Sequence, residues 1–264
     1  MKTKRIRLDE RLFERGMADS MEHARAVIMS GKVFVKGVRA DKPGTPISED
    51  AEIELRGGRE YVSRGGRKLQ SALEFFSVSP SGKVCIDCGA STGGFTDCLL
   101  KNGARMVYAI DVGYGQLAWS IRNDSRVVAM ERTNIRDVTP KMLDAEPEFA
   151  TIDVSFISLS LVLPVVRVLL ADEPEVLCLI KPQFEAEREK VGEKGVVREA
   201  ETHIAVLDAF VRHAERAGFC VKGVTNSPIR GPEGNIEFFG SLGTRGRSEE
   251  IDSPSIVAEA HLRL

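Results

Sequence analysis

A carboxylate followed by a cluster of glycines gives residues 84–95 the clearest chemistry in the sequence. Asp87 lies in a mostly apolar run, and Gly89, Gly93 and Gly94 follow it in the order D-x-G-x-x-x-G-G. We expect a short buried strand, a tight turn and a helix beginning near Gly93, which is where nucleotide-like ligands bind in α/β sheets. The carboxylate would repel the pyrophosphate that G-x-G-x-x-G sites hold, but it suits an ammonium and a sulfonium. The stretch therefore indicates S-adenosylmethionine, and a glycine turn without a ligand stays the alternative.

Polar residues at the ends of other strands extend this cofactor site. Asp111 lies 24 residues after Asp87, about the spacing at which an acid binds ribose hydroxyls. Either Asn134 or Asp137, which follow a third strand, is a candidate for the adenine edge. The predicted cofactor-binding residues are Asp87, Gly89, Ser91, Thr92, Gly93, Gly94, Phe95, Asp111, Asn134 and Asp137.

Two further strand ends carry residues with no task in cofactor binding, Asp153 and Lys181. Methyl transfer from a sulfonium is an in-line displacement that requires a positioned nucleophile. A ribose hydroxyl would have to lose its proton as it attacks, and a lysine in a partly dry cleft can accept one. The carboxylates of Asp153 and Glu237 could orient that lysine, and Lys68 could position the hydroxyl. The predicted catalytic residues are Lys68, Asp153, Lys181 and Glu237.

Alternating strands and helices must position these residues. Such alternation predicts an α/β fold, here a Rossmann-like sheet of the S-adenosylmethionine-dependent methyltransferase type with helices on both faces. A small α+β unit precedes it. We expect strands at 84–88, 105–111, 125–130, 149–153, 175–181, 219–224 and 236–242, and helices ending at Phe76 and spanning 95–102, 159–170, 203–217 and 256–264.

The N-terminal part of the chain is basic. Residues 1–70 contain 16 Lys and Arg against 11 Asp and Glu, whereas the whole chain of 264 residues has a net charge of −2. Helices at 7–16 and 21–30 with strands at 32–38 and 51–55 predict a compact unit. Its charge favours a polyanionic partner, and such side chains neutralise phosphates without reading sequence. The predicted RNA-binding residues are Arg5, Arg7, Arg11, Arg25, Lys32 and Lys36, with Arg64 and Arg67 in a glycine-rich segment.

Residues 5–58 resemble the S4 RNA-binding domain. The matching segments include Arg7-Leu8-Asp9, Ala24-Arg25 and Gly31-Lys32-Val33. The chain departs from the usual pattern at Ser20-Met21, where the family has Ser-Arg, and at Lys36-Gly37, where it has Asn-Gly. The resemblance implies an RNA-binding fold for this unit.

Lys68, Asp153, Lys181 and Glu237 match, in order and context, the K-D-K-E tetrad of FtsJ-like RNA 2′-O-methyltransferases. The sequence segments around them, residues 63–69, 153–159 and 181–185, resemble the TlyA (hemolysin A) family. That resemblance implies an S-adenosylmethionine-dependent rRNA 2′-O-methyltransferase acting on cytidine. It also implies an S4-like domain at 1–58, a linker at 59–63 and a methyltransferase domain at 64–264. Tyr61 stands where some members carry Trp in a short interdomain motif.

Three other functions are less favoured by the sequence. A pore-forming hemolysin is expected to have a signal region or a long apolar run, an inactive RNA-binding protein has no need of the tetrad, and a nicotinamide-dependent oxidoreductase has different glycine spacing. No metal is expected, since Cys85 and Cys88 form a C-x-x-C without a second pair. We expect ribosomal RNA or a ribosomal subunit as partner, no membrane contact and a cytoplasmic location. The modified nucleotide, the subunit and the oligomeric state stay open.

Overall fold

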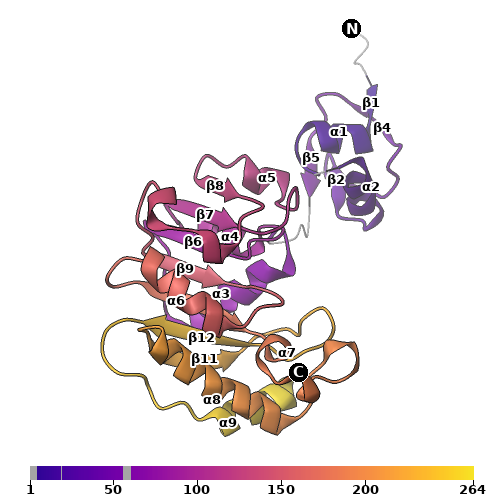
Figure 1. Ribbon diagram of the computed structural model, residues 1–264. Helices are drawn as coiled ribbons and strands as arrows, with labels where there is room; N and C mark the ends of the chain where they lie inside the picture. The colour runs from indigo at the N-terminus through magenta and orange to yellow at the C-terminus, as the bar shows by residue number, and fades with distance from the viewer. Residues whose placement is uncertain (1–4, 19, 56–60) are drawn as a thin grey trace. The chain divides into compact units, whose positions relative to one another are not determined.

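The computed structural model describes residues 5–18, 20–55 and 61–264 (Figure 1). Contacts divide the chain into two units, and each is described here by itself. The N-terminal unit comprises residues 1–60 and 118–123, and the sheet unit comprises residues 61–117 and 124–264. Of the linker expected at 59–63, residues 59 and 60 lie outside the described residues.

The N-terminal unit packs two helices against short strands. Leu8, Leu12, Ala24, Ile28 and Val33 are fully buried in its core. The expected strand at 32–38 is a hairpin, because Lys36 and Gly37 both have positive φ and form the tight turn. The elements are β1 (Arg5–Arg7), α1 (Leu8–Glu14), α2 (Met21–Met29), β2 (Val33–Val35), β3 (Val38–Ala40), β4 (Pro46–Ser48) and β5 (Ile53–Leu55). Strands β1 and β4 were not predicted; residues 7–16 were expected to begin a helix directly, and Pro46 opens β4.

The sheet unit is built on seven strands in the order β11-β12-β10-β9-β6-β7-β8. All neighbouring pairs are parallel except those that β12 makes with β10 and β11. This confirms the α/β fold. The strands are β6 (Val84–Cys88), β7 (Met106–Ile110), β8 (Val127–Met130), β9 (Phe149–Ile152), β10 (Glu175–Ile180), β11 (Cys220–Asn226) and β12 (Phe238–Gly243). The chain winds outward from β6 in one direction and from β9 in the other, so a topological switch point lies between these two strands.

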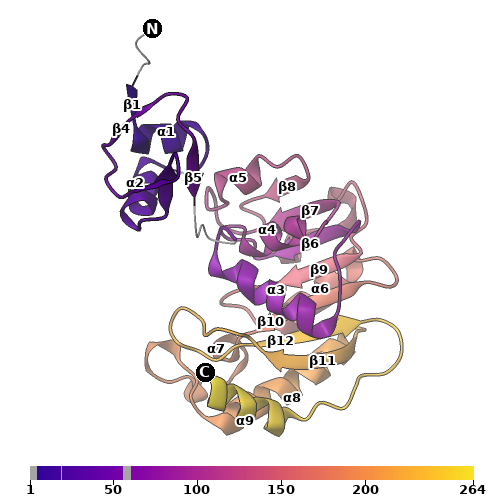
Figure 2. The same cartoon turned by 180° about the vertical axis from the view of Figure 1, so that it is seen from behind.

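Helices cover both faces of this sheet, as predicted. Alternate residues of β6 serve the two faces: Val84, Ile86 and Cys88 join a core with α6, α8 and α9, whereas Asp87 contacts α4. Figures 1 and 2 view the sheet from opposite sides, with α3 in front of it in Figure 2. The helices are α3 (Arg64–Phe76), α4 (Gly94–Lys101), α6 (Leu159–Leu169), α7 (Pro182–Glu185), α8 (Ala200–Arg216) and α9 (Ser253–Arg263), whereas α5 (Trp119–Arg122) falls in the N-terminal unit. The two four-residue helices were not predicted. No helix in the described ranges is long and apolar enough to cross a membrane.

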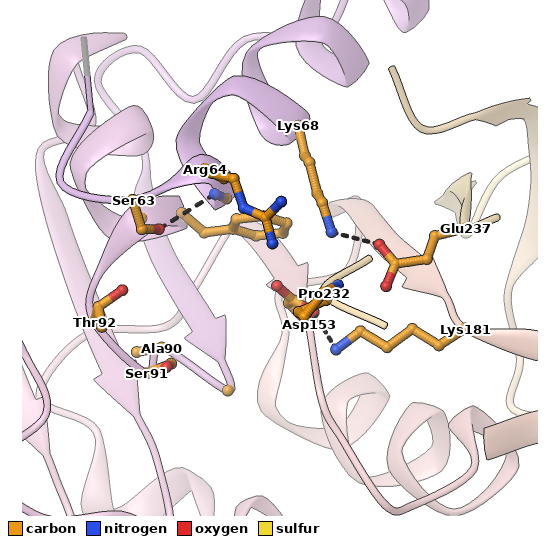
Figure 3. Close-up of a pocket in the computed structure, with 14 residues that line it drawn as sticks. Ser63, Arg64, Lys68, Ala90, Ser91, Thr92, Asp153, Lys181, Pro232 and Glu237 are labelled. Carbon is orange, nitrogen blue, oxygen red and sulfur yellow. Dashed lines mark hydrogen bonds and ion pairs between the residues drawn. The ribbon is translucent and has the colours of Figure 1, made fainter. Parts of the chain in front are cut away.

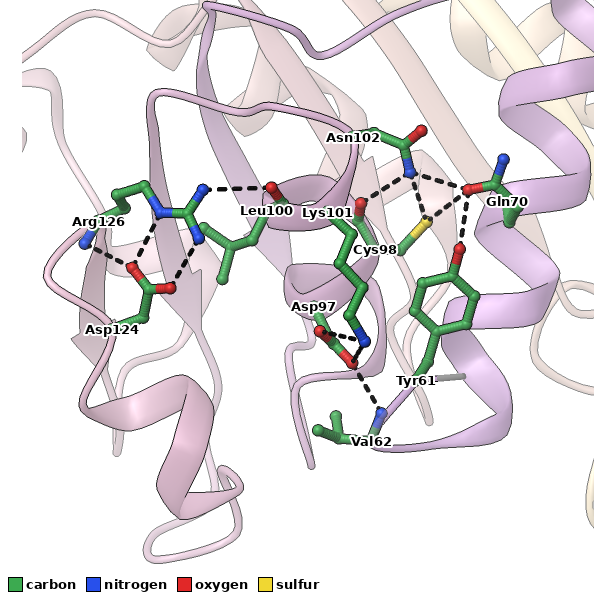
Figure 4. Close-up of polar contacts among 10 residues, drawn as sticks. All are labelled: Tyr61, Val62, Gln70, Asp97, Cys98, Leu100, Lys101, Asn102, Asp124 and Arg126. Atoms are coloured by element: carbon green, nitrogen blue, oxygen red, sulfur yellow. Dashed lines mark hydrogen bonds and ion pairs between the residues drawn. The ribbon is translucent and has the colours of Figure 1, made fainter. Parts of the chain in front are cut away.

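The chain enters the sheet unit along a set of polar contacts that tie α3 to α4 (Figure 4). The Tyr61 hydroxyl donates to Gln70 of α3 over 2.9 Å, and the Val62 amide donates to Asp97 of α4 over 2.8 Å. Lys101 lies 3.0 Å from the same Asp97 carboxylate. These contacts fix α3, and with it Lys68, relative to the glycine-rich turn from which α4 starts.

Candidate active site

The turn after β6 can be made only with glycine at its first position. Gly89 has φ of +88°, and a Cβ there would lie 2.5 Å from the backbone oxygen of Asp153. Gly93 also has a positive φ, +89°, at the N-cap of α4, and Gly94 has no room for a side chain beside Ser63. The glycines therefore let the turn fold tightly against the end of β9 and the start of α3.

Asp87 lies below this turn and does not line either pocket described here. It is fully buried, and it accepts hydrogen bonds from Thr96 over 2.6 Å and from Thr151 over 3.0 Å. Burial raises its pKa to about 7. This carboxylate joins β6 to α4 and β9. Its contact with the cofactor stays a prediction.

A pocket of about 1170 Å³ opens at the carboxyl ends of β6, β7 and β9. Gly89, Ser91, Asp111 and Asn134 line it. The Asp111 carboxylate accepts the Ser91 amide over 2.8 Å and the Gly113 amide over 2.7 Å, and so joins the first two turns of the sheet. Asp137 is exposed and does not line this pocket. Of the two residues predicted for an adenine edge, only Asn134 lines this pocket, and its contact with adenine stays a prediction.

A second pocket, of about 230 Å³, brings the predicted catalytic residues together (Figure 3). Lys68 forms an ion pair with Glu237, and both side chains are nearly fully buried. Lys181 Nζ lies 2.6 Å from Asp153 Oδ1 and donates to Ser155 Oγ over 3.1 Å. Two Lys–carboxylate pairs thus line one small pocket. The four residues are spread over positions 68–237 of the sequence.

Sheet register explains why residues so distant in sequence meet. Asp153 and Lys181 directly follow the adjacent parallel strands β9 and β10. Strand β12 runs antiparallel to β10 and pairs Phe238 with Ile180, so Glu237, directly before β12, lies at the edge where β10 ends. Helix α3 supplies Lys68 from the side.

The environment of Glu237 is dry and closely packed. Burial raises its pKa, and the nearby Lys68 opposes that shift. A Cβ on Gly231 would lie 2.5 Å from Glu237 Oε1, so only glycine lets the loop before β12 pass the carboxylate. The loop is tied in turn by the buried Asn235, which accepts the Val197 amide over 2.9 Å.

The two pockets are adjacent, because Gly89, Ser91 and Asp153 line both. Thr92, Gly94, Phe95 and Arg64 line the smaller one only. Gly93 and Arg67 line neither, and Arg67 is exposed. A ligand in the larger pocket can therefore present a group to the four charged residues in the smaller one.

An aromatic pair in the larger pocket was missed by the sequence reasoning. Phe156 is 90% exposed, has φ of +64°, and its ring centroid lies 5.0 Å from that of Phe184. A planar ring can stack on such a pair. Phe156 comes four residues after the end of β9, and nothing in the sequence pattern marks its side chain as exposed.

The predicted RNA-binding residues of the N-terminal unit differ in their surroundings. Arg7 and Arg25 both contact the buried Asp9, over 2.8 Å and 3.3 Å, and Arg11 pairs with Glu14. These arginines therefore also stabilise the unit. Arg5 and Lys36 are exposed and Lys32 is half-buried.

The cysteines of the sequence are all buried and free. Burial raises the pKa of Cys85 to about 12 and that of Cys88 well above its ordinary value, so both thiols stay protonated at neutral pH. Within the described residues, no group of three or more His, Cys, Asp and Glu side chains is placed to hold a metal ion.

Comparison with known proteins identifies the families that the two parts of the chain match. The FtsJ-like methyltransferase family matches residues 61–244, and the S4 domain family matches residues 6–53. The chain is 49% identical to a Bacillus subtilis protein described as a candidate rRNA methyltransferase, YqxC, over 100% of this chain and 97% of that one. It is 44% identical to the 16S/23S rRNA (cytidine-2′-O)-methyltransferase TlyA of Mycobacterium tuberculosis, over 89% of each chain.

A solved structure is similar to this chain in both sequence and fold. It comes from Streptococcus thermophilus, is described as a candidate hemolysin, and has 44% sequence identity with a TM-score of 0.74 over 99% of this chain and 97% of that one. The sequence matches cover both units of the chain. The chain therefore belongs to the FtsJ-like methyltransferase family and carries an S4 domain ahead of the methyltransferase domain.

Proposed function

We propose that the chain transfers a methyl group from S-adenosylmethionine to the 2′-hydroxyl of a cytidine ribose in ribosomal RNA. One observation carries the proposal. Two Lys–carboxylate pairs, Lys68–Glu237 and Lys181–Asp153, line a small pocket that opens beside a pocket large enough for a nucleoside. The M. tuberculosis relative named for this reaction supports cytidine in rRNA as the substrate.

The larger pocket suits the cofactor. Asp111 lies at its wall and, although it accepts two backbone amides, keeps free lone pairs for ribose hydroxyls. Asn134 lines the same pocket and is the candidate for the adenine edge. The tight turn at Gly89 and Ser91 leads from there to the smaller pocket. When bound, S-adenosylmethionine supplies a methyl group on a positively charged sulfur.

The smaller pocket suits a hydroxyl nucleophile. The Lys181 ammonium lies between Asp153 and Ser155, which hold it at the edge of the shared wall. From there the ammonium can orient the ribose hydroxyl. Once it has released a proton to solvent, the neutral Lys181 amine can accept the hydroxyl proton as the methyl group is transferred in line. The buried Lys68–Glu237 pair supplies a second fixed ammonium on the opposite side of the pocket (Figure 3).

The S4 domain supports RNA as the substrate, with Arg5, Lys32 and Lys36 as candidate phosphate contacts. Arg64, at the rim of the smaller pocket, is a candidate for the phosphates next to the target. We propose residues 1–58 as the RNA-binding domain, 64–264 as the methyltransferase domain and 59–63 as their linker. We propose a cytoplasmic location for the protein, because its proposed rRNA substrate is found there.

No observation favours a second function. The hemolysin names describe other proteins, and two ion pairs inside a pocket give no reason to carry that activity to this chain. A loss of catalysis is not supported either, since the four charged residues are paired and in place.

Mapping of 2′-O-methyl groups in rRNA from cells with and without the protein tests the proposal. We expect at least one cytidine to lose its methyl group when the protein is absent and to regain it on complementation. An identical methylation map in both strains would contradict the proposal.

A further inference from the structure

Two loops carry most of the proposed catalytic machinery, and they leave the sheet side by side. The first, residues 153–158, joins β9 to α6 and carries Asp153 and Phe156. The second starts at Lys181 and continues into α7. Since β9 and β10 are adjacent and parallel, with Cys178 opposite Ile152, the loops begin as neighbours.

The first loop has little support of its own. In the part of the chain that the structure describes, residues 154–157 make no hydrogen bond between backbone atoms. Phe156, in the middle, holds a positive φ of 64°, a conformation that costs energy for a bulky residue. A contact from outside the loop must therefore hold its shape.

Glu185 makes that contact from the end of α7. Its Oε2 accepts the Ser158 hydroxyl over 2.7 Å, and its Oε1 accepts the Leu159 amide over 2.7 Å. Leu159 is the first residue of α6, where backbone amides lack partners within the helix and a carboxylate is well placed. Both carboxylate oxygens thus bridge the second loop to the far end of the first.

The bridge joins the same two loops as the Lys181–Asp153 pair. Lys181 joins the loops at the sheet, through Asp153 and Ser155, and Glu185 joins them one helical turn further out. Phe184 and Phe156 contact each other between these two ties. We infer that Glu185 is a positioning residue, which fixes Asp153 and Lys181 relative to each other for methyl transfer; this inference rests on the proposed function.

The test compares single-turnover methylation of purified ribosomal subunits by wild-type protein and three variants, with S-adenosylhomocysteine affinity measured by calorimetry. Glu185→Ala should lower the methylation rate about 10- to 100-fold, the scale of a 1 Å misplacement, and change the affinity less than about twofold. Glu185→Gln should stay within about threefold of wild type in rate, because its amide can accept from Leu159 and donate to Ser158. Glu187→Ala, an exposed glutamate two residues on, is the matched control and should match wild type.

Hydrogen–deuterium exchange of residues 153–160 gives a readout that does not depend on activity. Deuterium uptake should rise in Glu185→Ala and stay at the wild-type level in Glu185→Gln. If the wild-type protein failed to methylate rRNA, the proposed function would fall, and exchange would still decide whether the bridge holds the loop.

Several outcomes would overturn the inference. The inference fails if the Glu185→Ala variant methylates within threefold of the wild-type rate, or if its rate falls only as far as its cofactor affinity does. It also fails if deuterium uptake is unchanged in Glu185→Ala, or if a folded Glu185→Gln variant loses as much methylation rate as Glu185→Ala. If Glu185→Ala does not fold, Ser158→Ala replaces it, because it removes one of the two hydrogen bonds. Ser158→Ala should lower the rate about two- to fivefold with raised uptake, and wild-type behaviour in both would again overturn the inference.

Discussion

Burial gives different roles to the aspartates at the ends of β6 and β9. Asp87 is fully enclosed and bonded to two threonines, whereas Asp153 is partly exposed beside Lys181. The first supports the turn, and the second lines the smaller pocket, where we propose that it takes part in the reaction. The sequence indicated that both belong to the site, but it could not separate them, because side-chain burial depends on the packing of α4 and β9.

Asp87→Asn tests the buried carboxylate. The pKa of Asp87 is raised from an ordinary value near 3.8 to about 7. The folded state therefore holds its proton over a pH range in which the unfolded state has released it, and wild-type stability falls as the pH rises through this range. Asparagine does not titrate. The free energy of unfolding of Asp87→Asn minus that of wild type should therefore rise by about 1–3 kcal/mol between pH 5 and pH 8, as measured by urea denaturation. A constant difference across this range would contradict the assignment.

Lys181→Arg separates two roles of the lysine. Arginine keeps the positive charge but does not give up its proton in proteins. If Lys181 accepts the hydroxyl proton, Lys181→Arg and Lys181→Ala should both lose on the order of 10²–10⁴ in single-turnover rate, with cofactor binding retained. Near-wild-type methylation by the arginine variant would leave only an electrostatic role.

At the scale of elements, the site depends on turns that meet at one edge of the sheet. The strand positions and the glycine-rich turn were predictable, because apolar runs and glycines mark them in the sequence. The sequence analysis grouped Glu237 with Lys181, but the structure pairs Glu237 with Lys68. That pairing was not predictable, since it requires knowing that β12 runs antiparallel to β10 and that α3 packs beside it. The exposure of Phe156 was not either, since it follows from the backbone conformation of one loop.

Gly89→Ala tests how closely these turns approach each other. Its Cβ would collide with the backbone of Asp153, so the turn and the end of β9 must shift. We expect S-adenosylmethionine affinity to fall at least tenfold by calorimetry. Gly82→Ala is the matched control, because Gly82 also has a positive φ, +72°, but open space around it. Equal effects of the two substitutions on affinity would show that the approach to Asp153 is unimportant.

At the scale of the whole molecule, some of the basic residues predicted to bind RNA also form ion pairs that stabilise the N-terminal unit. The sequence showed a basic N-terminal third, but it did not show that Arg7 and Arg25 share the buried Asp9. Removing either arginine should weaken the fold of the N-terminal unit as well as RNA binding. Exposed lysines such as Lys36 offer a cleaner test of binding alone.

Lys36→Asn removes one charge and keeps a residue that tolerates the positive φ of this turn. We expect rRNA affinity to fall and the slope of log K against log salt to become shallower by about 0.7–0.9, as for one lost phosphate contact. Lys141→Asn, an exposed lysine of the sheet unit, is the control. An equal change in slope for both variants would argue against a specific role of the N-terminal unit.

The most direct test of the account uses purified protein, ribosomal subunits and S-adenosylmethionine with a deuterated methyl group, followed by mass spectrometry of the nucleosides. We predict one labelled nucleoside type, 2′-O-methylcytidine, with wild-type protein and labelling at least about 100-fold slower with Lys181→Ala, although both bind the cofactor. Label on a base, or equal label with the Lys181→Ala variant, would contradict the assignment of this pocket as the site of ribose methylation.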